Sequence, residues 1–167
     1  MSKAATSLLR RVWIGAAILV ASSMPGVAAS YVVEGKTVRI LDGDTIEILD
    51  AKNVTHRIRL EGIDAPEKSQ PHGQDSKAAL SKMVFGKTVT VKVSKREKWG
   101  RELGEVTVDK VDVNGSLVRY GHCWVYRAYP HRKELEAYEA EAKAAKRGLW
   151  AADVAPIPPW NWRRGIR

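Results

Sequence analysis

Residues 57–67 read RIRLEGIDAPE, and this stretch decides how the rest of the chain is interpreted. Its first half alternates between charged and apolar residues, which predicts a strand with one face toward solvent and the other toward a core. Pro66 cannot continue a strand ladder and disfavours helix at the residue before it. We therefore expect Arg59 on the rigid strand, with Asp64 and Glu67 at its end and in the exit loop, where functional sites are commonly built.

Two further short motifs lie before and after this stretch. Residues 41–45 read LDGDT, and residues 99–101 read WGR. Alone, an aspartate-glycine pair is more often an ordinary turn, and Arg59 with Glu67 could form a surface ion pair worth less than ~1 kcal/mol. An EF-hand loop starting at this turn does not fit, because it needs glycine where Glu47 stands.

The three motifs occur in the order that marks the staphylococcal nuclease (thermonuclease) family, which the chain resembles. That signature is a DGDT turn, an R-x4-D-x-P-E segment and a Y-G-R-like loop. The likeness continues through LVRYG at residues 117–121 and covers about residues 35–150. The resemblance implies an enzyme that cleaves DNA and RNA with little sequence preference and leaves the phosphate on the 3′ side.

The chain divides into three parts. Its 167 residues give room for one domain with a sizeable core. Residues 1–29 combine basic residues, an apolar run and a small-residue end, which predicts a secretory signal peptide cleaved after Ala29. The alternative is an uncleaved membrane anchor, but the apolar run is shorter than the ~20 residues that span a bilayer. Residues 30–150 form the predicted nuclease-like OB-fold domain, and residues 151–167 form a tail rich in Pro, Trp and Arg.

Charge and cysteine content limit the function classes. Removing residues 1–29 takes away three of the 28 basic residues and none of the 19 acidic ones, which lowers the net charge from +9 to +6. A basic exported domain attracts polyanions such as nucleic acid, acidic sugars or anionic lipid.

Cys123 is the only cysteine, so no intramolecular disulfide can form. We expect a buried thiol there, and a monomeric secreted or periplasmic protein without stable membrane association.

The hydrophobic pattern from residue 31 to residue 110 has a period of two. Between the third and fourth apolar runs, residues 74–85 predict a helix that Gly86 ends. Five strands with such a helix indicate an α+β protein with a mainly β core, namely a five-stranded OB-fold barrel with three helices. The predicted strands, rich in Val, Ile and Thr, contain residues 37–41, 45–49, 58–60, 89–93 and 106–108.

Two more helices are predicted after the barrel. Asn114 can cap a short helix that runs to Tyr120, although a hairpin turn at residues 114–115 is the alternative. A longer helix is predicted over about residues 133–146, with an apolar stripe and a charged face that we interpret as solvated. The tail has too much proline for a regular element, and either docks its tryptophans on the domain or stays mobile.

The residue types in the motifs suit phosphodiester hydrolysis. Arg59 and Arg101 can pair with phosphate oxygens, because guanidinium groups bind them bidentately and stay protonated. Asp44 and Asp64 offer the hard oxygen ligands that Ca²⁺ prefers, with carbonyls and waters completing its shell. Glu67 is then the candidate general base, or the group that orders the attacking water.

The resemblance implies the same roles and adds one backbone ligand. Threonine is common in the family where Ala65 stands, but the carbonyl is the implied ligand, so we expect the change to be tolerated. The implied calcium ligands are Asp44, Asp64 and the carbonyl of Ala65, and the implied catalytic residues are Arg59, Glu67 and Arg101.

Aromatic residues offer candidate contacts to the bases. Trp99 stands where the family often has tyrosine, and a ring there could stack on a base for ~1–3 kcal/mol. Tyr126, Arg127 and Tyr129 are further substrate-binding candidates, although the aromatic positions are shifted relative to the usual family pattern. Lys95 could contact a phosphate or serve solubility.

Three functions compete at this point. The first is an exported calcium-dependent nuclease acting on DNA and RNA. The second is a noncatalytic nucleic-acid-binding OB-fold module of the same descent, and the third is a polyanion-binding or envelope protein. The nuclease is favoured, because a binding module has no evident need for both arginines together with all three motif carboxylates.

Overall fold

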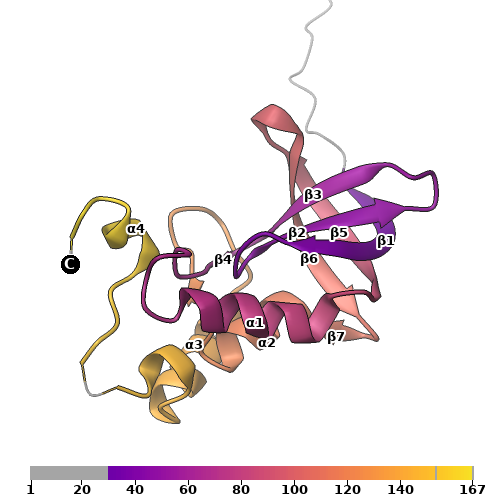
Figure 1. The fold of residues 1–167 in the computed structure, drawn as a ribbon. Coiled ribbons are helices and arrows are strands. Elements are labelled where there is room, and N and C mark those ends of the chain that lie inside the picture. The colour runs from indigo at the N-terminus through magenta and orange to yellow at the C-terminus, as the bar shows by residue number, and fades with distance from the viewer. Residues whose placement is uncertain (1–29, 153, 167) are drawn as a thin grey trace, which may run out of the picture.

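The computed structural model describes residues 30–152 and 154–166. The predicted signal peptide lies outside the described residues. The predicted OB-fold barrel is confirmed (Figure 1). Antiparallel pairings join five strands in the order β3-β2-β1-β5-β6, and a parallel pairing of β3 with β6 closes the ring. These strands are β1 (Tyr31–Ile40), β2 (Thr45–Asp50), β3 (Thr55–Leu60), β5 (Thr88–Arg96) and β6 (Arg101–Val108).

Three additional strands of two residues each were not predicted. β4 (Ile63–Asp64) pairs with β8 (Trp124–Val125), and β7 (Val111–Asp112) continues the sheet beside β6. Two residues are too few to show a hydrophobic period, so only the structure reveals them. The β4–β8 pair matters for function, because it fixes the end of the 57–67 stretch against the segment that carries Tyr126.

The barrel interior is filled by the apolar half of each alternating strand. Ile58 and Leu60 are fully buried. On the other face of the same strand, Arg57 is exposed and Arg59 is half-buried. The same alternation buries Val89, Val91 and Val93 of β5, Ile46 and Ile48 of β2, and Val106 of β6. The predicted two-faced strand is therefore confirmed, and Arg59 projects from a rigid wall.

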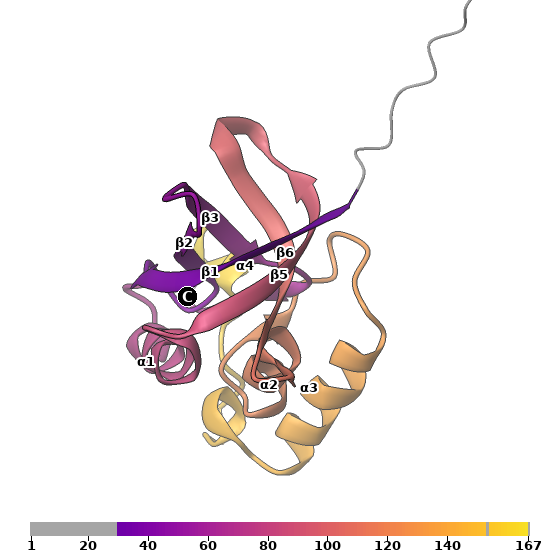
Figure 2. The same cartoon turned by 90° about the vertical axis from the view of Figure 1, so that its right-hand side faces the viewer.

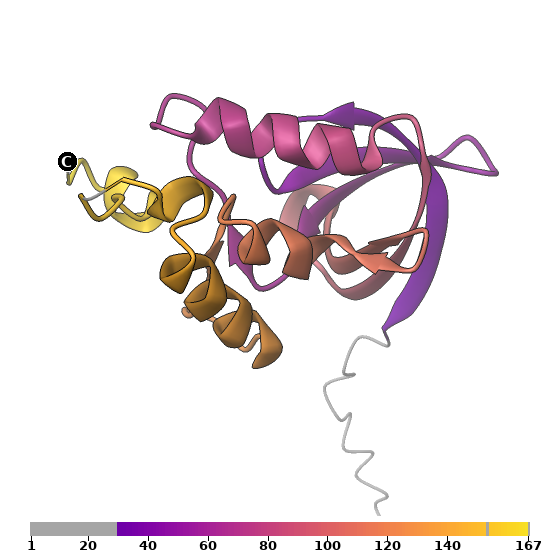
Figure 3. The same ribbon diagram turned by 90° about the horizontal axis from the view of Figure 1, so that it is seen from below.

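Helices cover one end of the barrel. α1 (Gly73–Val84), which the sequence predicted as a helix over residues 74–85, lies across it and packs on α2 (Val113–Arg119), and α2 packs in turn on α3 (Glu134–Ala144) (Figure 3). Single 3-10 turns occupy Lys98–Gly100 and Gly148–Trp150. Among the described residues, no helix is long and apolar enough to cross a membrane.

Two local predictions about α2 and α3 were wrong in detail. The side chain that caps α2 is Asp112, which accepts the N–H of Gly115 at 3.0 Å. Asn114 is instead buried, and its amide bonds the backbone of Val106 and Glu61 across the barrel end. On α3 the charged face is not simply solvated, because Glu139 is buried.

The tail contains a regular element after all. Residues 159–162 form the single-turn helix α4 (Pro159–Trp162), which begins with proline at the position where a missing N–H costs nothing. Beyond α3 the chain leads away from the helices and then turns so that α4 lies on the same side of the barrel as β4 (Figures 1 and 2). Pro159 is buried there, so the docked alternative is the correct one for this segment.

Candidate active site

A pocket of about 790 Å³ opens at the barrel end where β2 and β3 meet the exit loop of residues 61–67. All three sequence motifs reach it. The predicted site residues that line the pocket are Asp44, Arg59, Asp64, Ala65, Glu67, Arg101, Tyr126 and Tyr129.

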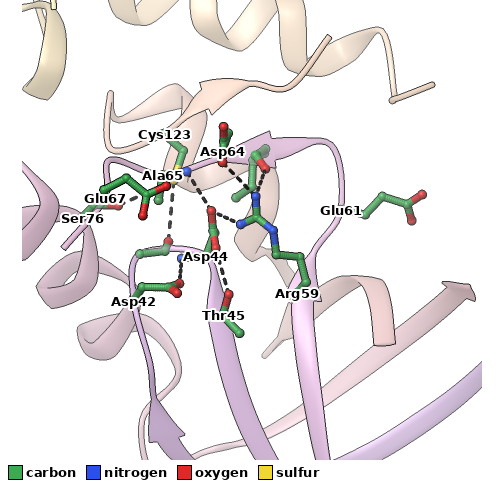
Figure 4. A network of polar contacts seen from close by, with 12 residues as sticks. Asp42, Asp44, Thr45, Arg59, Glu61, Asp64, Ala65, Glu67, Ser76 and Cys123 are labelled. Atoms are coloured by element: carbon green, nitrogen blue, oxygen red, sulfur yellow. Dashed lines mark hydrogen bonds and ion pairs between the residues drawn. The ribbon is translucent and has the colours of Figure 1, made fainter. Parts of the chain in front are cut away.

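Arg59 is the centre of the site. Its guanidinium forms an ion pair with Asp44 on one side and with Asp64 Oδ1 at 2.9 Å on the other (Figure 4). The backbone sets up this arrangement, because Arg59 lies opposite Thr45 in the β2–β3 ladder. The N–H of Leu60 also donates to the carbonyl of Asp44 at 2.8 Å, which holds the acidic turn of residues 42–44 against β3.

Asp44 is buried and charged. Burial opposes its ionisation, but the guanidinium of Arg59 and the N–H of Ala65, 2.8 Å from Oδ2, outweigh that cost and hold the pKa of Asp44 below its ordinary value. Burial opposes the charge of Arg59 in the same way, yet the two aspartates raise its pKa. Burial and the neighbouring Asp44 raise the pKa of Asp42 to about 6.

The acidic turn leaves no room for a larger residue at its centre. A Cβ atom on Gly43 would lie 2.1 Å from Ser76 Oγ and 2.7 Å from the Cβ of Ala65. Behind the turn, Cys123 Sγ contacts the Gly43 carbonyl at 3.7 Å, and burial raises the pKa of this thiol. The expected buried thiol is thus found, packed beneath the site as part of its floor.

Glu67 lies in the loop after Pro66, and a buried glutamine orders this loop. Gln70 accepts the N–H of Glu67 at 3.0 Å through its side-chain oxygen. Its amide nitrogen donates to the carbonyl of Ile157 in the tail at 2.6 Å. Gln70 therefore joins the backbone of the candidate base to the C-terminal segment. Glu61, by contrast, points away from the cluster (Figure 4).

The two aspartates provide the donor set for a metal. In the described part of the chain, no three side chains of His, Cys, Asp and Glu gather as a metal site. A cation would therefore depend on Asp44, Asp64, backbone carbonyls and water. Both aspartates contact the same guanidinium, and carboxylate oxygens are ligands that fit a hard cation of the calcium type.

Arg101 and Trp99 lie on the β5–β6 side of the pocket region. Arg101 opens β6 and lines the pocket, and its Nε donates to Glu97 Oε2 at 2.6 Å. Trp99 is fully exposed, with a left-handed backbone (φ 70°), and is not part of the pocket lining. Its ring is free of packing among the described residues, as a base-stacking side chain must be before substrate binds.

Arg127 does not join the site. Tyr126 and Tyr129 line the pocket and lie with ring centroids 5.7 Å apart. Arg127 is not among the lining residues, and its Nη2 donates to the buried Glu139 at 2.8 Å. Its role as a substrate-binding residue stays a prediction, because its guanidinium pairs with Glu139 outside the pocket lining.

Arg163 is the site residue that the sequence did not reveal. Its guanidinium reaches the pocket from the tail and contacts Asp64 Oδ2 at 2.8 Å and Glu67 Oε1 at 2.7 Å. The tail has no hydrophobic period, and Arg163 is separated from Glu67 by 96 positions. The basic residues at the end of the tail were the only signal available.

Comparison with known proteins gives a consistent result. A model described as "Staphylococcal nuclease homologue" matches residues 57–152. An "Uncharacterized endonuclease" of Escherichia coli O157:H7 is 47% identical over 132 residues, which cover 78% of this chain and 85% of that protein. A "Probable staphylococcal-like nuclease" of Oryza sativa subsp. japonica is 45% identical over 112 residues, 67% of this chain and 34% of that longer protein. An "Uncharacterized endonuclease" of Haemophilus influenzae is 40% identical over 129 residues, 77% of this chain and 72% of that protein.

Proposed function

The chain belongs to the staphylococcal nuclease family and is a nuclease, and we propose that it is a calcium-dependent phosphodiesterase acting on both DNA and RNA. It cleaves with little sequence preference and leaves 3′-phosphate ends. The observation that carries the proposal is the shared pocket, in which one arginine bridges two buried aspartates beside Glu67 and Arg101.

The arginines neutralise the phosphate. Arg59 is held in place by Asp44 and Asp64, so its planar group is oriented before substrate arrives. Arg101 is half-exposed and paired only with Glu97 in the contacts described, so it can exchange that partner for a phosphate oxygen. Two guanidinium groups reaching one pocket can stabilise the negative charge that builds on phosphorus oxygens during displacement.

Asp44 and Asp64, with the carbonyl of Ala65, would hold the calcium ion. When bound, the ion supplies Lewis acidity and a fixed template for the phosphate. The low pKa of Asp44 keeps this ligand ionised over the physiological range. The loss of a threonine hydroxyl at Ala65 leaves the carbonyl in place, so the donor set remains complete.

Glu67 is the proposed general base. Its side chain is 40% exposed at the pocket and can reach a water molecule there. The hydrogen bond from its own N–H to Gln70 fixes the loop that carries it. A positioned carboxylate that accepts the proton of attacking water contributes about 10²–10⁴-fold to the rate.

A digestion assay with the mature protein tests the proposal. Plasmid, single-stranded DNA and RNA are expected to be degraded with millimolar calcium, to stay intact with chelator, and to yield 3′-phosphate ends by end labelling. DNA that is bound but uncut at millimolar calcium would instead favour the noncatalytic binding module.

Two variants test the residue roles. Glu67→Gln and Arg101→Ala are expected to lower turnover by at least about 10²-fold while nucleic-acid binding largely persists. Glu61→Gln is the matched control, because Glu61 lines the pocket but points away from the cluster. Activity in Glu67→Gln equal to that of the control would remove Glu67 from the mechanism.

We also propose that the protein is exported and acts as a monomer. Support for export comes from the signal-peptide pattern of residues 1–29. N-terminal sequencing of protein from the culture fluid or periplasm is expected to begin at Ser30. An intact Met1 in a membrane fraction would favour the anchor.

A further inference from the structure

The tail places a third arginine in the pocket. Arg163 Nη1 lies 2.7 Å from Glu67 Oε1 and 3.3 Å from Asp64 Oδ1, and Nη2 lies 2.8 Å from Asp64 Oδ2. One guanidinium thus spans the proposed metal ligand and the proposed general base. No assignment of the catalytic roles above uses it.

This position is built by the fold rather than reached by a loose end. Pro159 is buried, and the carbonyl of Ile157 accepts the amide of buried Gln70 at 2.6 Å. The same glutamine accepts the N–H of Glu67, so the tail and the catalytic loop share one anchor. Arg163 follows α4 directly and is 42% exposed at its side chain, so it faces the pocket with solvent on one side.

The charge of the pocket requires such a cation. Its lining has six carboxylates and four cationic side chains, so its net formal charge is −2 with Arg163 and −3 without it. A nucleic-acid phosphate brings a further negative charge into this pocket. Even with a divalent cation bound, the lining would stay net negative without Arg163, which opposes entry of a polyanion.

The tail also presents an aromatic ring on the same side. Trp160 lies three residues before Arg163, a spacing that brings side chains to one helix face, and its ring centroid is 6.2 Å from that of Tyr126. Tyr126 and Tyr129 line the pocket. An arginine beside a row of rings is the combination with which proteins bind single-stranded nucleic acid.

We propose that Arg163 is a substrate-binding residue of this nuclease. In the free protein its guanidinium neutralises Asp64 and Glu67. With a cation bound at Asp64, the guanidinium would be released to a phosphate oxygen of the nucleic acid, and Glu67 would be left free to accept a proton from water. This inference rests on the proposed function, since it uses the same site and the same substrate class.

A binding experiment tests the proposal apart from catalysis. A labelled single-stranded oligonucleotide is titrated with Arg101→Ala protein in calcium, and its anisotropy and integrity are followed. Adding Arg163→Gln is expected to weaken binding about tenfold, the value of one charge-assisted contact, and to lower the slope of log affinity against log salt by about 0.7. Arg163→Lys is expected to retain the salt slope and part of the affinity.

Arg164→Gln is the matched control, because it removes the same charge from the neighbouring exposed residue. It is expected to change affinity less than threefold. In the protein that retains Arg101, Arg163→Gln is expected to raise KM more than it lowers kcat. The proposal is overturned if Arg163→Gln and the Arg164→Gln control bind the oligonucleotide equally well while Arg163→Gln binds calcium more tightly by calorimetry. Arg163 would then only compete with the cation for Asp64.

The two proposals fail separately. If the chain does not cleave nucleic acid, the proposed function fails, and the binding titration still decides the role of Arg163. If Arg101→Ala protein still cleaves the oligonucleotide, the role of Arg163 is decided instead by the KM and kcat of the Arg163→Gln protein. Unchanged binding and KM would overturn the role of Arg163 and leave the digestion results standing.

Discussion

Arg59 combines structural and chemical roles in one residue. It pairs with two aspartates that are almost fully buried, Asp44 and Asp64, and it faces the pocket where phosphate would bind. An uncompensated buried carboxylate is costly, so the guanidinium stabilises the fold before it contacts any substrate. Substitutions at this position therefore change stability as well as turnover, and the two effects have to be measured separately.

Arg59→Ala is expected to lower the free energy of unfolding at pH 7 by about 3 kcal/mol, because it leaves Asp44 buried without its ion pair. Asp44 has a lowered pKa in the folded protein, so its contribution is present above the unfolded pKa and is lost as pH falls through the folded one. The cost of Arg59→Ala should accordingly stay constant down to the ordinary carboxyl pKa of 3.8 and shrink below it. Urea unfolding at neutral pH and at a series of pH values below 3.8 measures this change.

Arg57→Ala is the control for that prediction. Arg57 lies two residues earlier on β3 and pairs with Glu47 at 2.8 Å, but its side chain is 54% exposed. Exposed pairs contribute under ~1 kcal/mol, so a small loss without pH dependence is expected. Equal losses for the two variants would show that the buried aspartates do not depend on Arg59.

Individual site residues were predictable where local pattern and motif agree. Strand alternation placed Arg59 on a wall and Pro66 placed Glu67 in the exit loop, as the structure shows, whereas Asp64 lies in the separate short strand β4. Arg163 was not predictable, because its role arises from docking of a distant tail that has no periodicity. Arg127 was assigned to the substrate side because the sequence does not show that Glu139 is buried against it.

At the scale of elements, length decides what a sequence reveals. The five barrel strands and α1 are long enough to show their period, and the structure has all of them. The two-residue strands β4 and β8 and the one-turn helix α4 are too short for a period, yet they bring Asp64, Tyr126 and Arg163 to the pocket. The predicted elements build the scaffold, and the short unpredicted ones complete the site.

Glu139 on α3 offers a test of how this helix is attached to β8. Glu139 is buried, accepts the N–H of Val125 in β8 at 3.0 Å and pairs with Arg127 and Lys143, each at 2.8 Å. Glu139→Ala leaves the Val125 N–H without this partner and removes two ion pairs. We expect a loss of about 3 kcal/mol, measured by thermal or urea unfolding.

Glu136→Ala on the same helix is the comparison. Glu136 is 52% exposed and pairs with His131, so a loss under ~1 kcal/mol is expected. A Glu139→Ala protein as stable as Glu136→Ala would mean that β8 is held by its pairing with β4 alone.

At the scale of the whole molecule, barrel closure creates the site. The parallel pairing of β3 with β6 sets Arg57 opposite Arg101, so two arginines 44 positions apart in the chain come to neighbouring strands. The barrel was predictable from the spacing of its strands and helix, and the structure adds the strand order that brings Arg59 and Arg101 to the lining of one pocket. The sequence pattern does not extend to the tail, whose described contacts with the domain include the Ile157 carbonyl at Gln70, the Trp160 ring beside Tyr126 and Arg163 in the pocket.

Ending the chain after Ala155 tests whether the tail belongs to the fold or only to the site. The main hydrophobic core runs from Ile46 to Leu135 and contains no tail residue. The deletion removes one buried proline and the Gln70 bond to Ile157, which should cost about 1–3 kcal/mol and lower Tm by roughly 3–10 °C. One cooperative transition by circular dichroism is expected, together with oligonucleotide binding at least as weak as that of Arg163→Gln. Loss of the cooperative transition would show instead that the barrel needs the tail to fold, because the anchor at Gln70 would then order the whole acidic loop.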